Sequence, residues 1–214
     1  MVHRTAEELD EEHALILAAQ QDRARFAALY ERYVDRIYGY VLGLTRDRDL
    51  AEEITAATFA RALEELPRFE FRGVPYSAWL YRVATNLVHR QRRRRGWIEL
   101  VPHLADGGAG PDELAERADR AAEVRAAVAQ LPDDQRQAVL LRFGGELRNR
   151  EIADLMGRSE GAIKLLTFRA LTALRRRLGA PTPAERRALV VAPRNAERGS
   201  GVLSGDEETL DALG

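Results

Sequence analysis

The sequence predicts an all-α protein with two helical domains joined by a flexible acidic linker. Apolar residues recur at steps of three and four in several segments, the spacing that places them on one face of a helix. No segment has the alternating pattern of a strand. The stretch 97–120 combines glycine, proline and acidic residues and divides the helical segments into two groups. We therefore expect an acidic N-terminal extension at 1–21, domains at 22–96 and 121–179, and a disordered tail at 180–214.

The bulk composition excludes several classes of protein. The chain has no cysteine, which rules out disulfides and thiolate metal sites. It has no run of about 18 apolar residues, and its acidic N-terminus lacks the order of a secretory signal. Four scattered histidines and the absence of a Gly-rich phosphate loop leave no catalytic constellation. We expect a cytoplasmic, non-catalytic protein with no cofactor, metal or membrane partner.

The first domain is predicted to contain three helices. The first covers 23–44, and the second covers 49–66 and ends before Pro67. Two prolines and a glycine make 67–77 a loop, and a third helix follows from about 76 to 95. The apolar stripe of this third helix consists of Trp79, Leu80, Val83, Ala84 and Leu87.

The loop and the third helix together have the composition of a nucleic-acid surface. The loop carries aromatic residues, and from Arg82 to Arg95 there are six arginines and no acid. Aromatic rings stack on bases and arginines neutralise the backbone, which single-stranded nucleic acid requires. In the alternative interpretation the aromatic residues belong to the core and the arginines form a solvated helix end. For Trp79 and Phe59 we expect core packing.

Charge is distributed in blocks although the chain is nearly neutral, with a net charge of −1. Residues 21–98 sum to +5 and residues 135–179 to +6, whereas residues 99–134 between them sum to −6. Two basic blocks separated by an acidic one indicate two surfaces that bind polyanions. This distribution of charge is more informative than the net charge, which alone would argue against such binding.

Residues 151–178 are predicted to form a helix-turn-helix. Gly157 supplies the left-handed residue that ends a helix, and Ser159 is placed as the N-cap of the next helix. The N-terminal part of such a second helix enters the major groove, where basic residues read guanine and apolar atoms touch the thymine methyl. An ordinary helical hairpin with a solvated basic face remains the alternative.

Both halves resemble the extracytoplasmic-function (ECF, group 4) subfamily of sigma-70 RNA polymerase sigma factors. In residues 22–95 the resemblance to region 2 rests on AEEITAATF and WLYRVATN. In residues 124–178 the resemblance to region 4 rests on LPDDQR and EIADLMG. The motifs follow in the order and at the distance typical of the family.

The resemblance implies a transcription-initiation subunit of RNA polymerase that recognises promoter DNA. Region 2 would bind the β′ clamp helices of the core enzyme through Asp47, Asp49, Glu52 and Glu53. It would recognise and melt the −10 element through Phe71, Arg72, Arg82, Asn86, Arg90 and Arg93. Region 4 would bind the β flap through its apolar side, and the −35 element through Lys164, Leu165, Thr167, Phe168 and Arg169. An anti-sigma factor is a further possible partner.

Three rival functions stay open at the level of sequence. A stand-alone helix-turn-helix regulator would bind duplex DNA without polymerase, and an enzyme or an RNA-binding helical protein fits the motifs less well. The acidic extension 1–21 is a candidate shield for a basic surface before polymerase binds.

Overall fold

The computed structural model describes residues 5–71, 73–94 and 112–179, and every regular element among them is helical, which confirms the all-α prediction. The elements are α1 (Ala6–Gln21), η1 (Arg23–Arg25), α2 (Phe26–Thr45), α3 (Arg48–Glu65), η2 (Leu66–Arg68), α4 (Tyr76–Arg94), α5 (Asp112–Ala129), α6 (Asp133–Val139), a π-helical turn η3 (Leu140–Gly144), α7 (Asn149–Met156) and α8 (Glu160–Arg177). None of the described helices is long and apolar enough to cross a membrane. The predicted tail lies outside the described residues.

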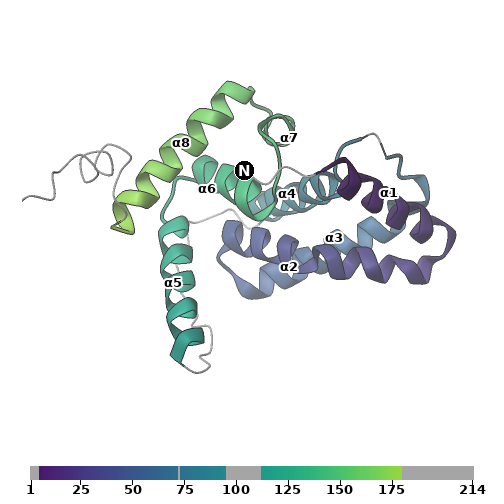
Figure 1. The fold of residues 1–214 in the computed structure, drawn as a ribbon, viewed down its shortest axis with the longest axis horizontal. Coiled ribbons are helices and arrows are strands. Elements are labelled where there is room, and N and C mark those ends of the chain that lie inside the picture. Colours follow the sequence, from purple (N-terminus) through teal and green to yellow (C-terminus); the bar gives the residue numbers. More distant parts are fainter. Residues whose placement is uncertain (1–4, 72, 95–111, 180–214) are drawn as a thin grey trace, which may run out of the picture. The chain divides into compact units, whose positions relative to one another are not determined.

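Helices α2, α3 and α4 pack pairwise and form the first helical group (Figure 1). Their ends lie within three residues of the predicted ones. Helix α3 begins after Asp47, whose side chain accepts a hydrogen bond from the backbone N of Leu50 at 3.0 Å. It ends before Pro67, as expected, and the prolyl residue falls in the following 3₁₀ turn η2.

Helix α1 occupies most of the stretch interpreted from the sequence as an acidic extension. A capping box starts it: the Thr5 hydroxyl accepts from the backbone N of Glu8 at 3.2 Å, and the Glu8 carboxylate accepts from the backbone N of Thr5 at 2.8 Å. Ile16 and Ala19 are buried against α2 and the 3₁₀ turns. Residues 6–21 are therefore a packed part of the fold.

The second helical group contains α5, α6, η3, α7 and α8. Gly157 has a φ of 63° at the end of α7, and the Ser159 hydroxyl accepts from the backbone N of Ala162 at 3.2 Å. Both residues thus have the roles expected in a helix-turn-helix. Helix α5 begins at Asp112, within the predicted linker. Its first turns are rich in Ala, Glu and Arg, which favour a helix even where no clear apolar stripe marks one in the sequence.

The two helical groups share one hydrophobic core. Leu141, Leu147, Ile152 and Ile163 from the second group are fully buried in the same cluster as the apolar residues of α2 and α4. A smaller cluster joins α5, α6 and α8 through Ala127, Leu131, Val139, Ala170 and Leu174.

Candidate nucleic-acid interface

The polar face of α4 presents four of the predicted −10 residues together. Arg82, Asn86, Arg90 and Arg93 are all exposed, and their spacing of four, four and three places them on one side of the helix. The opposite side is buried through Leu80, Tyr81, Ala84 and Val88. The buried stripe therefore fixes the orientation of a basic face that is open to solvent.

Arg92 has a different role from the arginines around it. Its guanidinium donates to the Asp133 carboxylate at 3.1 Å and to the carbonyl oxygen of Leu44 at 3.1 Å. It therefore connects α4 to the second helical group. The pKa of His89, one turn earlier, is lowered by burial and by the charges of Arg92 and Arg93.

Most aromatic residues of the predicted loop pack against one another. The Tyr76 ring lies 4.9 Å from the Phe69 ring and 5.4 Å from the Trp79 ring, measured between centroids. Phe59 is buried in the core, and Trp79 is half-buried and packs against it, in line with the core packing expected for both. Phe71 is half-buried and stacks on His13 of α1 at 4.6 Å. Arg72, the other loop residue predicted to contact the −10 element, lies outside the described residues.

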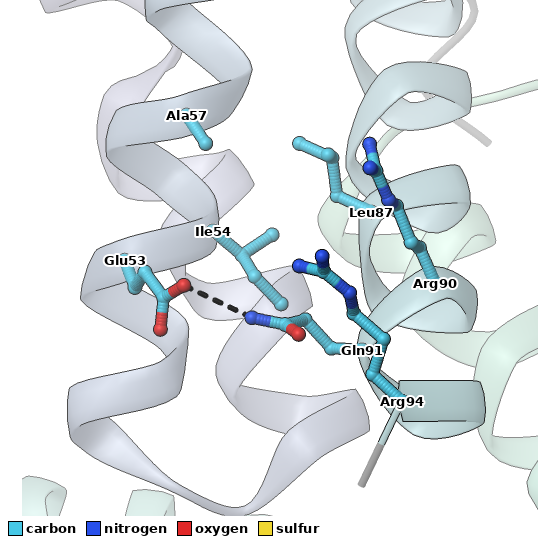
Figure 2. Close-up of a pocket in the computed structure, with 7 residues that line it drawn as sticks. All are labelled: Glu53, Ile54, Ala57, Leu87, Arg90, Gln91 and Arg94. Carbon is cyan, nitrogen blue, oxygen red and sulfur yellow. Dashed lines mark hydrogen bonds between the residues drawn. The ribbon is translucent and has the colours of Figure 1, made fainter.

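The acidic start of α3 is exposed except for Asp47, which is half-buried and caps the helix. Asp49, Glu52 and Glu53 point to solvent from the first two turns. Glu53 also accepts a hydrogen bond from the Gln91 side chain at 2.9 Å, across a pocket of about 190 Å³ between α3 and α4 (Figure 2). The pocket is lined by Glu53, Ile54, Ala57, Leu87, Arg90, Gln91 and Arg94. It separates the predicted polymerase surface from the predicted −10 surface, since Glu53 lies on one side and Arg90 on the other.

Helix α8, the second helix of the helix-turn-helix, exposes four of its five predicted DNA-contacting residues. Lys164 and Arg169 are exposed, and the exposed fraction is 47% for Leu165 and 65% for Phe168. Thr167 is placed differently, because it is half-buried and its hydroxyl oxygen is buried with no hydrogen-bond partner.

Helix geometry explains the position of Thr167. It is four residues after Ile163 and three before Ala170, so it belongs to the buried stripe that continues to Leu174. Thr167 was predicted to contact DNA, but its spacing from Ile163 and Ala170 places it on the buried side of the helix. The structure thus favours Lys164, Leu165, Phe168 and Arg169 over Thr167 as the exposed set.

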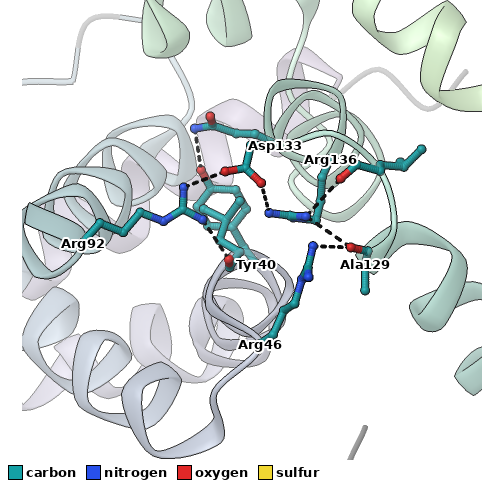
Figure 3. A network of polar contacts seen from close by, with 9 residues as sticks. Tyr40, Arg46, Arg92, Ala129, Asp133 and Arg136 are labelled. Atoms are coloured by element: carbon teal, nitrogen blue, oxygen red, sulfur yellow. Dashed lines mark hydrogen bonds and ion pairs between the residues drawn. The ribbon is translucent and has the colours of Figure 1, made fainter. Parts of the chain in front are cut away.

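A buried polar network joins the two helical groups beside α4 (Figure 3). The Tyr40 hydroxyl lies 2.7 Å from the Thr85 hydroxyl and accepts from the Gln137 side chain at 3.1 Å. Burial raises the pKa of Tyr40 to about 12, so this phenol stays protonated at neutral pH.

Arg136 is the buried cation of the same network. It is 2% exposed and donates to the carbonyl oxygens of Ala129 and Leu131 and to the Asp133 carboxylate. Burial lowers the pKa of its guanidinium, while the Asp133 carboxylate raises it. Arg46, with a left-handed φ of 58°, donates to the same Ala129 carbonyl.

Outside this network, a bidentate ion pair joins Arg36 of α2 to Glu146 at 2.9 and 3.3 Å. No sequence signal indicated the long-range pairs made by Arg36, Tyr40 and Arg46, because their partners lie about 40 to 110 positions away. Among the described residues no cluster of histidine and acidic side chains could hold a metal ion.

Comparison with known proteins identifies the family. Residues 29–98 match the family model described as Sigma-70 region 2, and residues 121–174 match Sigma-70, region 4. The chain belongs to the sigma-70 family of RNA polymerase sigma factors. The first matched segment contains the basic face of α4, and the second contains α8 up to residue 174.

Curated relatives place the chain in the ECF subfamily of this family. The chain is 34% identical over 171 residues to the ECF RNA polymerase sigma factor BldN of Streptomyces coelicolor, covering 77% of this chain and 64% of that protein. It is 33% identical to SigD of Mycobacterium tuberculosis, covering 62% of this chain and 63% of SigD. It is 31% identical to ShbA of Streptomyces griseus, covering 59% of this chain and 69% of ShbA. The chain thus spans slightly less than two thirds of BldN and SigD.

Solved structures share the fold. The sigma factor RpoE of Bartonella quintana, crystallised with the anti-sigma factor NepR, superposes with a TM-score of 0.60 at 24% identity and covers 73% of this chain and 98% of RpoE. CnrH, solved in complex with the cytosolic domain of CnrY, superposes with a TM-score of 0.56 at 18% identity. The match covers 80% of this chain and 99% of CnrH.

Proposed function

We propose that this chain is a non-catalytic, cytoplasmic specificity subunit that binds core RNA polymerase and directs promoter-specific initiation. The observation that carries the proposal is the pair of exposed basic helix faces, one on α4 and one on α8. They lie in the two segments that match sigma regions 2 and 4. A subunit that reads two promoter elements needs two such surfaces on one chain.

In this proposal the α4 face contacts the −10 element. Arg82, Arg90 and Arg93 would neutralise phosphates, and the Asn86 amide can both donate to and accept from a base edge. Phe71 and Arg72 would contribute from the preceding loop. A half-buried ring such as Phe71 can offer one side for stacking on an unpaired base.

The α8 face would contact the −35 element in the major groove. Lys164 and Arg169 can donate to guanine, while Leu165 and Phe168 can touch a thymine methyl. The buried position of its hydroxyl makes Thr167 a weaker candidate than its neighbours. The exposed acids Asp49, Glu52 and Glu53 of α3, with Asp47, would bind the β′ clamp helices. The apolar side of region 4 would meet the β flap.

We further propose that an anti-sigma factor regulates the chain. Two proteins with the same fold, RpoE and CnrH, were solved in complex with NepR and with the cytosolic domain of CnrY. This partner is an expectation from fold similarity, and co-purification from the source cells would test it.

The proposed function is tested by reconstituted transcription. Purified chain is mixed with core RNA polymerase and a library of genomic fragments, and the transcripts are sequenced. Start sites that share −35 and −10 elements would support the proposal and give the promoter sequence. Tight duplex binding without co-elution with core polymerase would instead favour a stand-alone regulator.

A further inference from the structure

Three side chains of α1 contact the described parts of the segment that leads from α3 into α4, residues 66–71 and 73–76. Gln20 binds its beginning, His13 its middle and Glu12 its end. This segment leads into the basic face of α4 and contains two residues predicted to contact the −10 element. A helix outside the matched region 2 segment is therefore attached to the proposed promoter-reading surface.

Glu12 fixes the point where the segment enters α4. Its side chain is completely buried, and its carboxylate accepts from the backbone N of Tyr76 at 2.9 Å and from the Tyr33 hydroxyl. Tyr76 is the first residue of α4, so its amide has no partner within the helix. An acidic group at this end is also favoured by the helix dipole.

Gln20 and His13 contact the first part of the segment. The Gln20 amide donates to the carbonyl oxygens of Leu66 and Phe69, at 2.9 and 2.8 Å, and so closes the 3₁₀ turn η2. The His13 ring stacks on Phe71 with a centroid distance of 4.6 Å and an interplanar angle of 15°.

The core contacts of α1 are separate from these polar contacts. Ile16 and Ala19, which are 1% and 2% exposed, anchor the helix on the same face. Losing the Gln20 amide therefore removes two hydrogen bonds to the segment and leaves the apolar anchor in place. A variant at this position tests positioning without removing α1.

We propose that α1 is a positioning element for −10 recognition. Gln20 fixes the 3₁₀ turn at Leu66 and Phe69, His13 fixes Phe71, and Glu12 fixes Tyr76 at the start of α4. This inference rests on the proposed function. A segment held in one conformation loses little entropy when a DNA strand binds. A released segment spends only part of its time in the competent conformation, and the apparent affinity falls by that fraction.

The test uses holoenzyme made from the full chain and core polymerase. The probe is a fluorescent single strand carrying the −10 sequence found by transcript sequencing. Gln20→Ala is paired with Gln21→Ala, because Gln21 is exposed at the neighbouring position, and Glu12→Gln is paired with Glu11→Gln for the same reason. Affinity for the −10 strand, for a strand with one −10 base changed, for a −35 duplex and for core polymerase is measured for each variant.

Gln20→Ala and Glu12→Gln should weaken binding to the −10 strand roughly tenfold, the effect of losing one or two hydrogen bonds. They should also reduce discrimination against the changed strand. Affinity for core polymerase and for the −35 duplex should stay within twofold, and the paired controls should behave as the unmodified chain.

Two results would overturn the inference while leaving the proposed function intact. The first is equal −10 affinity for Gln20→Ala and Gln21→Ala. The second is an equal loss for the −10 strand, the −35 duplex and core polymerase, because that indicates general destabilisation. An unmodified chain that binds no promoter with polymerase would remove both proposals.

Discussion

Adding a single methyl group at Gly145 should destabilise the contact between the two helical groups. Gly145 follows η3 and packs on the ring of Tyr81 in α4. A Cβ at this position would lie 2.7 Å from the carbonyl oxygen of Leu141 and 2.9 Å from Cε2 of Tyr81. Both distances are shorter than real Cβ contacts, and one of the two atoms belongs to the backbone. The neighbouring Gly144 provides the control, because a Cβ there meets nothing within 4 Å.

The expected magnitude follows from comparing the two variants. Overpacking a filled site costs about 1–3 kcal/mol. Replacing glycine by alanine at an unstrained site stabilises the fold by about 0.4–1 kcal/mol, because the unfolded chain has less conformational entropy. Neither Gly144 nor Gly145 has a positive φ, so this second effect applies to both and cancels between them. Gly145→Ala should therefore be about 1–3 kcal/mol less stable than Gly144→Ala.

Urea unfolding followed by circular dichroism at the helix band measures this difference. The unfolding midpoint of Gly145→Ala should fall with an unchanged slope, which reports a change of stability at constant exposed area. Equal midpoints for Gly145→Ala and Gly144→Ala would refute the close packing of η3 on α4. A lower midpoint for both variants would mean that alanine destabilises the turn rather than the contact with Tyr81.

Three further predictions concern the core, the buried phenol and helix α8. Ile152→Ala should cost about 2–4 kcal/mol in urea unfolding because Ile152 is fully buried in the shared core, whereas Leu165→Ala should change stability by less than about 0.5 kcal/mol. Burial raises the pKa of Tyr40 to about 12, so the unfolded chain releases this proton first, from about pH 10. Stability should fall as the pH rises from 10 to 12, by up to about 1.4 kcal/mol per unit, and Tyr40→Phe should show a shallower fall. Arg169→Ala should weaken promoter binding by the holoenzyme by about 1–3 kcal/mol if the residue reads a base, and an unchanged promoter-opening rate would contradict that role.

Local patterns in the sequence were sufficient to predict the helices that carry the candidate surfaces. The 3.6-residue period located α2, α3, α4 and α8, and the turn chemistry of Gly157 and Ser159 located the corner of the helix-turn-helix. These signals act within a few residues, so they can be interpreted without the fold. The predicted exposed face of α4 follows from the same period. That of α8 does so except for Thr167, whose spacing from Ile163 and Ala170 places it on the buried side.

Contacts between distant residues could not be predicted in this way. Glu12 stands in an acidic stretch that is typical of a solvated extension, yet it is completely buried. Its burial depends on a hydroxyl 21 residues away and a backbone amide 64 residues away. The shared core could not be predicted for the same reason. The sequence pattern around Leu147 and Ile152 fits a core inside a separate second domain equally well. The period of a helix shows which face is apolar and leaves open what covers it.

The packing of the two groups imposes a condition on the proposed function. The −35 and −10 elements are about 25 base pairs apart, which is roughly 85 Å of duplex. Helix α7 packs against α4, and α8 starts three residues after α7 and is about 27 Å long at ~1.5 Å per residue. If the α4 and α8 faces bind these two elements, as we propose, we expect the two helical groups to separate on the promoter. Gly145→Ala, which weakens their contact, should bind core polymerase up to about tenfold more tightly for each 1.4 kcal/mol by which it destabilises the closed packing. Titration of fluorescent chain with core polymerase measures this, and a Gly145→Ala affinity no higher than that of Gly144→Ala would mean that opening the contact does not limit assembly.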